Sequence, residues 1–72
     1  MPHIQVHAIK DVFSSAQKKE VIEKLTDTMV AIEGEAMRGV TWVTFHEVAS
    51  GDWGIGGKVL TTEDVRAIQR GG

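Results

Sequence analysis

The chain has 72 residues, no cysteine and a formal net charge of −2, and 25% of its residues are charged. This length allows one domain, over residues 1–72, with a core too small for much stability, so self-association is expected. The mixed charges form no basic stripe and no apolar run reaches the length of a membrane span, which argues against nucleic-acid and membrane partners. The N-terminus lacks a signal-peptide pattern, and we expect a cytoplasmic protein.

The first predicted element is a strand over residues 3–9, where apolar and polar side chains alternate. One face carries Ile4, Val6 and Ala8, and the other carries His3, Gln5, His7 and Ile9.

A helix is predicted from about residue 16 to residue 33. Ser14 stands three residues before Gln17, which is the spacing of a capping box, and Gly34 is typical of a helix end. The apolar residues that recur at helical spacing, and so form the predicted buried stripe, are Val21, Leu25, Met29 and Ile32, with Ile22 and Val30 beside them.

A second strand is predicted over residues 40–48, which are rich in β-branched and aromatic side chains. One helix between two strands fits a parallel pair with a right-handed crossover. Residues 53–58 contain too much glycine for a helix and predict a hairpin or tight loop, and Thr61 to Asp64 cap a short helix that ends near Gln69. Such a small sheet keeps one face and its edges uncovered, and sibling subunits are the expected cover.

Two features suggest sites but favour structural roles. The segment from Gly54 to Gly57 lacks the Gly-Lys-Ser/Thr ending of a phosphate loop, so its glycines indicate only an unusual backbone. His3 and His7 share a strand face about 13 Å apart, too far for one metal ion, and His46 would have to be brought to one of them by folding. We therefore interpret the histidines as polar sheet or interface residues and expect no metal and no cofactor.

The candidates for acid–base chemistry are few. Asp11, Glu47 and Asp52 lie at the ends of predicted elements without any sign of burial, and no serine or cysteine motif supports a nucleophile. Pro2 directly follows the initiator methionine, and methionine aminopeptidases remove Met1 before proline. The new N-terminus would then be a secondary amine at the start of a strand.

These residues together resemble a known family. Pro2 opens a strand that reads Ile-Gln-Val-His at residues 4–7, residues 45–48 read Phe-His-Glu-Val, and residues 51–57 read Gly-Asp-Trp-Gly-Ile-Gly-Gly. Over nearly the whole chain this is similar to the short-chain 4-oxalocrotonate tautomerase family. The pattern of that family has an N-terminal proline and a glycine-x-aromatic-glycine-isoleucine-glycine-glycine segment.

The resemblance implies an α+β fold of the β-α-β tautomerase type with a C-terminal hairpin. Two chains would form a four-stranded sheet, and three dimers would form a homohexamer held through sheet and hairpin. It also implies an isomerase that moves a proton between the enol and keto forms of a small 2-keto acid or related carbonyl compound. The Pro2 amine would be the general base, and Trp53 would form an apolar wall. Such a wall lowers the amine pKa from about 7.7–8.0, which suits a base at neutral pH.

The sequence departs from the family at the two arginines that usually hold the substrate carboxylate. One of their positions falls on Trp42, and the other falls on Val12 or Phe13. The pocket is therefore expected to be more apolar and to suit an aromatic or monoanionic keto acid. Arg38 and Lys10 are the nearest basic residues that would compensate, and surface solvation is the alternative for both.

Three hypotheses remain open. The first is the tautomerase, and the second is a non-catalytic homo-oligomer of the same fold that binds a hydrophobic small molecule, which the lost arginines favour. An unrelated small domain is the third. Hydratase, dehalogenase and decarboxylase reactions of the family need a charged amine or further acid–base partners, and the sequence shows no clear set.

Overall fold

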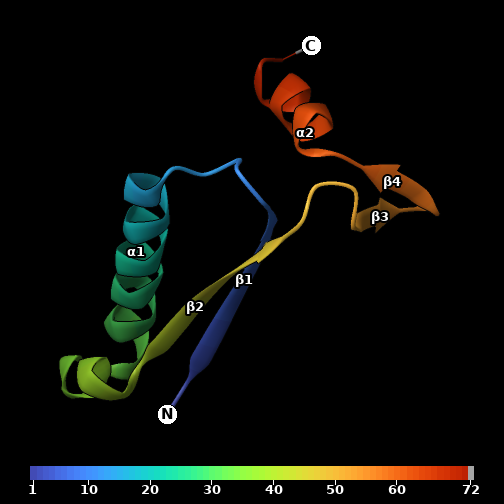
Figure 1. Cartoon of the computed structure of the whole chain (residues 1–72). Coiled ribbons are helices and arrows are strands. Elements are labelled where there is room, and N and C mark those ends of the chain that lie inside the picture. The colour runs from blue at the N-terminus through green and yellow to red at the C-terminus, as the bar shows by residue number, and fades with distance from the viewer. Residues whose placement is uncertain (72) are drawn as a thin grey trace.

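The computed structural model describes residues 1–71. In chain order the elements are β1 (His3–Ile9), α1 (Ser15–Glu33), the 3-10 helix η1 (Glu35–Val40), β2 (Trp42–Val48), β3 (Trp53–Ile55), β4 (Lys58–Leu60) and α2 (Thr62–Gln69) (Figure 1). The predicted β-α-β fold with a C-terminal hairpin is confirmed. The second strand begins two residues later than predicted, because Val40 belongs to η1.

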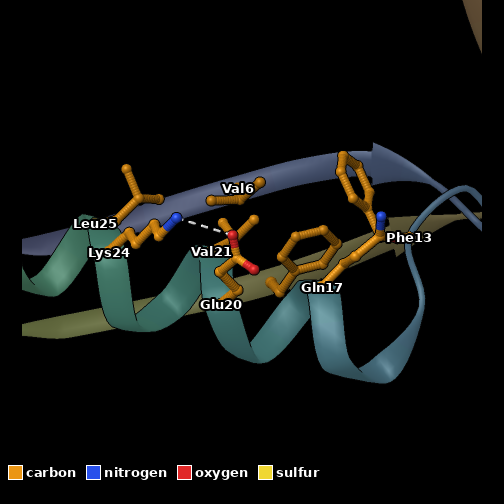
Figure 2. A pocket seen from close by; sticks show the side chains of 8 residues that line it. Val6, Phe13, Gln17, Glu20, Val21, Lys24 and Leu25 are labelled. Atoms are coloured by element: carbon orange, nitrogen blue, oxygen red, sulfur yellow. Dashed lines mark hydrogen bonds and ion pairs between the residues drawn. The ribbon is translucent and has the colours of Figure 1, made fainter. Parts of the chain in front are cut away.

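The strands β1 and β2 form a parallel pair in continuous register, from His3 opposite Trp42 to Ile9 opposite Val48. Opposed residues of a parallel pair point to the same side, so the side chains of Val6 and Phe45 share one face. This is the face that α1 covers, since both side chains line a cavity with residues of that helix (Figure 2). The opposite face carries the polar side chains and is open over most of its length.

The ends of α1 follow the predicted signals. The Ser14 hydroxyl accepts the Gln17 N–H at 3.1 Å, and the Gln17 side chain accepts the Ser14 N–H at 2.9 Å. Gly34 ends the helix with φ at 110°, a conformation that side chains rarely adopt. The predicted stripe is wrong at one position: Val30 is the buried residue, only 4% exposed, whereas Ile32 is 80% exposed.

The glycine-rich segment forms the antiparallel hairpin of β3 and β4, with Trp53 opposite Leu60 and Ile55 opposite Lys58. Gly56 and Gly57, which make its turn, both have positive φ, at 58° and 83°, as a tight two-residue hairpin turn requires. The hairpin and α2 extend away from α1, beyond the carboxyl ends of β1 and β2 (Figure 1).

The C-terminal elements cover one end of the open sheet face. The Thr62 hydroxyl donates to the Lys10 carbonyl at 2.7 Å, and Ile9 lines a cavity with Leu60 and Val65. Alternation placed Ile9 on the polar face, yet it is only 5% exposed because these elements pack over it.

The single chain has little core. None of its described side chains is fully buried, and Trp42, Ile55, Val59 and Ile68 are exposed. The radius of gyration is 14.9 Å, against about 11 Å for a compact domain of this length. The accessible surface is 5099 Å², against about 4,400 Å² for a monomer of this mass. The single chain is therefore less compact than a monomer of its size and leaves large apolar side chains exposed.

Candidate functional site

The predicted site residues lie at the two opposite ends of the parallel strand pair. Pro2 and Trp42 lie at the amino end, where the Trp42 N–H donates to the Pro2 carbonyl at 3.0 Å. Val12, Phe13 and Trp53 lie at the carboxyl end, where all three line one cavity of about 340 Å³. The seven residues of β1 separate the two groups by about 23 Å. Within one chain, therefore, Pro2 and Trp53 do not form a common pocket.

Pro2 is half-buried and directly precedes β1. Its carbonyl joins the ladder through Trp42, so its position is set by the parallel pairing rather than by a loose terminus. Met1 is 77% exposed and so is accessible to an aminopeptidase.

Trp42 stands at the start of β2 and is 52% exposed. Its indole packs edge-to-face against the His3 ring, with centroids 5.8 Å apart, on the sheet face away from α1. An aromatic side chain therefore lies close to Pro2 in the fold, at the position where the sequence comparison expected an arginine.

Arg38, the basic residue expected to compensate, is held by two carboxylates. Its Nη1 donates to Asp27 at 2.8 Å, and its Nε donates to Glu35 at 2.8 Å. The hydrogen bond from Arg38 holds the pKa of Glu35 below its ordinary value, and the same bond raises the pKa of Arg38. In the single chain, the guanidinium thus joins η1 to α1.

Phe13 lies between two cavities. It lines the cavity near Trp53 and also a cavity of about 520 Å³ between α1 and the sheet. In the second, its ring meets Phe45 edge-to-face at 5.5 Å, and Val6, Val21 and Leu25 complete an apolar wall (Figure 2). An ion pair between Lys24 and Glu20 lies beside that wall, at 2.9 Å. The cavity thus has an apolar wall with polar side chains of α1 at its edge.

The loop that carries Val12 and Phe13 is fixed from three sides. The Asp11 N–H donates to Glu47 at 3.1 Å, Glu47 pairs with Lys18 of α1, and Arg66 of α2 donates to the Asp11 carbonyl at 2.7 Å. The Lys18 hydrogen bond and the Asp11 N–H lower the pKa of Glu47. Asp11 and Glu47, which the sequence raised as acid–base candidates, therefore belong to a structural network.

Two basic residues that the sequence did not single out line a cavity at this loop. A polar cavity of about 520 Å³ is lined by Val12 and Phe13 together with Lys18 and Arg66. Both cations are paired, Lys18 with Glu47 and Arg66 with Glu63. No sequence spacing reveals this placement, because Arg66 comes from the last helix.

The histidines gather on the open sheet face around Thr44. The Nε2 atoms of His3 and His46 lie 2.9 and 2.7 Å from the Thr44 hydroxyl, and the His7 ring stacks on His46 at 4.8 Å. Folding thus brings His46 into contact with His7 and connects it to His3 through the Thr44 hydroxyl. Within residues 1–71, however, no three His, Asp or Glu side chains are grouped as metal ligands. The described helices also include none that is long and apolar enough to cross a membrane.

The parallel β-α-β unit with its C-terminal hairpin defines a class, the small β-α-β proteins of the tautomerase type. The sequence profile of the tautomerase enzyme family matches residues 2–63. The chain belongs to the tautomerase family.

Individual relatives agree with this assignment. The probable tautomerase K2 of Dickeya dadantii (strain 3937) is 34% identical over 61 residues, covering 85% of this chain and 90% of the relative. A structure from a study of 4-oxalocrotonate tautomerase isozymes of Methylibium petroleiphilum superposes with a TM-score of 0.70 at 31% identity, over 89% of this chain and 97% of the other. DmpI from Helicobacter pylori has a TM-score of 0.61 at 24% identity, over 92% and 94%, which supports the fold alone.

Proposed function

We propose that this protein is an isomerase that transfers a proton between the enol and keto forms of a small 2-keto acid or related carbonyl compound. The general base is the secondary amine of Pro2 after removal of Met1. The observation that carries the proposal is membership of the tautomerase family together with a proline at residue 2, where the family match begins.

The chemistry needs an uncharged amine at neutral pH. Pro2 is the only proline, and with Met1 attached its nitrogen is an amide that cannot accept a proton. Once free, the amine takes a proton from the enol oxygen or from one carbon and returns it to another carbon. An apolar pocket lowers the amine pKa toward the operating pH, where a base works best. Trp53 and Trp42 are the side chains proposed to supply this environment.

The proposed site is formed between chains. Pro2 and Trp53 lie at opposite ends of β1, so a pocket that contains both needs the hairpin of one subunit beside the N-terminus of another. Exposed Ile55 and Val59 on that hairpin, and the elongated shape of the subunit, support a homo-oligomer. We propose the hexamer, a trimer of dimers, as the functional form.

The proposed substrate follows from the side chains at the two arginine positions. Trp42 at one, and Val12 or Phe13 at the other, present apolar surface where a dicarboxylate would require bidentate partners. An aromatic keto acid with a single carboxylate fits such a pocket better. Arg38 contributes to this pocket only if the substrate carboxylate replaces one of its two carboxylate partners in the assembled protein.

The test begins with the intact mass of protein from its native host, which should lack Met1. Ketonisation of phenylenolpyruvate is then measured for this protein and for Pro2→Ala, which retains a free but primary and repositioned amine. We expect kcat/KM to fall by about 10² to 10⁴, the usual contribution of a positioned base. Equal rates for the two proteins would exclude the proline mechanism.

A second candidate function is a non-catalytic oligomer that binds a hydrophobic small molecule. The observation in its favour is the absence of arginine at residues 12, 13 and 42, together with the apolar cavity lined by Phe13 and Phe45. Retained Met1 in native protein, no ketonisation, and saturable binding of an aromatic acid would together support this function over catalysis.

A further inference from the structure

One carboxylate near the N-terminus lacks the partners that its burial demands. Glu33 is the last residue of α1, and its Oε2 accepts a hydrogen bond from the Thr41 hydroxyl at 2.9 Å. Across residues 1–71, Glu33 Oε1 is the one buried side-chain oxygen or nitrogen without a hydrogen-bond partner. Buried carboxylate oxygens are normally paired because the loss of hydration is costly, so this atom calls for a donor.

The one donor that Glu33 has is shared. The Thr41 hydroxyl also lies 2.8 Å from the Met37 carbonyl, and a hydroxyl carries a single proton. Thr41 therefore cannot donate to both oxygens at once. When the proton points to Met37, neither oxygen of the Glu33 carboxylate has a donor.

Glu33 is linked to the Pro2 end of the sheet by hydrogen bonds at two adjacent residues, Thr41 and Trp42. The Trp42 N–H donates to the Pro2 carbonyl at 3.0 Å, and the residue before Trp42 is Thr41, which contacts Glu33. The parallel register begins at His3 opposite Trp42, and Pro2 and Thr41 are the residues that directly precede this pair in the chain. The Glu33 carboxylate thus contacts Thr41 at the same end of the sheet as Pro2.

The other charged groups in this region are already engaged. Arg38 of η1 pairs with Glu35 and Asp27, each at 2.8 Å, and makes no contact with Glu33. The His3 ring points to the opposite sheet face, where it contacts Thr44 and Trp42. The described residues therefore offer Glu33 no cation of their own, apart from the amine that removal of Met1 would create.

We propose that Glu33 is a positioning residue that holds the cationic form of the Pro2 amine. This inference rests on the proposed removal of Met1, after which the charged amine carries two N–H donors. One of these donates to Glu33 Oε1 and satisfies the unpaired oxygen. The interaction stabilises the charged amine and raises its pKa, in opposition to the apolar walls, which lower it. The working pH of the base is then set by the balance between Glu33 and those walls.

The decisive measurement follows the Pro2 nitrogen directly. Because the chain has one proline, protein labelled with ¹⁵N-proline gives a single resonance whose titration reports the amine pKa. The titration is carried out on the processed oligomer for the wild type, Glu33→Gln and Glu23→Gln. Glu23 is the matched control, since it is an exposed glutamate of α1.

Glu33→Gln should lower the Pro2 pKa by about 1 to 3 units, and Glu23→Gln should leave it unchanged. The acid limb of the pH profile of kcat/KM should move by the same amount, which a merely structural role of Glu33 would not produce. Glu33→Asp keeps the charge but shortens the side chain, and should give an intermediate pKa. It replaces Glu33→Gln as the deciding variant if the latter does not fold.

The same pKa in the wild type and in the deciding Glu33 variant would overturn the inference, as would an equal fall in Glu23→Gln. The readout does not require turnover. Suppose that Glu33→Gln lowers the Pro2 pKa but that Pro2→Ala ketonises phenylenolpyruvate as fast as the wild type. This result would uphold the Glu33 contact and remove only the tautomerase mechanism.

Discussion

The two halves of this chain differ in the length of their helices and strands and in how far their apolar side chains are covered within the chain. The β1-α1-β2 unit has a helix of 19 residues with both ends capped, and a parallel pair in register over seven positions. The C-terminal unit has strands of three residues and a helix of eight, and its hairpin leaves Ile55 and Val59 exposed. The first unit covers one face of its strand pair with α1, whereas the second leaves large apolar side chains of its own hairpin exposed.

The attachment between the two units is small and specific. The Thr62 hydroxyl donates to the Lys10 carbonyl at 2.7 Å, and the Thr62 N–H donates to the Ser50 hydroxyl oxygen at 2.9 Å. Ile9 is buried beneath the same elements. A few contacts thus hold β3, β4 and α2, which together form an arm that carries Trp53. The arm lies at the carboxyl end of β1 and β2, whereas Pro2 lies at their amino end. If the site forms between subunits, as proposed above, the arm needs a fixed direction more than a core of its own.

The largest effect is expected where the units meet. Ile9→Ala removes a buried side chain that contacts the C-terminal elements, and large-to-small changes of this kind cost about 2 to 5 kcal/mol. Chemical denaturation should show this loss. Ile32→Ala is the control on the first unit, since Ile32 is 80% exposed, and its effect should stay within about 0.5 kcal/mol. Equal losses would mean that Ile32 is buried in the assembly.

A smaller effect is expected from the arm itself. Ile55→Ser removes an exposed apolar side chain of β3, so it should leave the secondary structure of the subunit intact. If the hairpin packs on a neighbour, burial worth about 1.5–3 kcal/mol is lost, and the dissociation constant should rise by at least about tenfold. Sedimentation measures this change. Lys58→Ser, on the same hairpin, is the polar control. If both variants have the dissociation constant of the wild type, the hairpin does not pack on a neighbour and the proposed difference between the halves is wrong.

The sequence predicted the fold well because its signals are local. Alternation defined β1, the Ser14–Gln17 capping box and Gly34 bounded α1, and the glycines at 56 and 57 made the hairpin turn. It misjudged Ile32 because helical spacing alone does not fix where the stripe ends once the chain leaves the sheet. Val40 was misplaced for a related reason, since β-branched composition cannot distinguish the end of η1 from the start of a strand.

The candidate site was predictable only in part. Pro2 and Trp53 followed from a motif, yet nothing in their spacing showed that β1 separates them. Arg66 donates a hydrogen bond to the Asp11 carbonyl, 55 positions away in the sequence. Glu33 became a candidate only through its contact with Thr41, which lies between η1 and β2. These placements depend on long-range packing, which periodicity in one segment does not record.

The smallest effect concerns the ion pair that fixes the loop before α1. Lys18 and the Asp11 N–H hold the pKa of Glu47 below its ordinary value of 4.5 in the folded chain. A group with a lowered folded pKa stabilises the fold fully above its unfolded pKa, and this stabilisation disappears as the pH falls through the folded value. Glu47→Gln should therefore reduce stability at neutral pH and flatten the decline of stability below about pH 4.5, most clearly at low salt.

Glu23→Gln is the control, because the contact of Glu23 with Lys19 is exposed at 3.9 Å. This variant should keep the wild-type decline of stability in acid, measured by denaturation at several pH values. If both variants flatten this decline equally, the Glu47 ion pair does not hold the loop. The loop is then held by the hydrogen bonds from Thr62 and Arg66 of α2 to its backbone carbonyls, so the first unit depends on the second for the position of this loop.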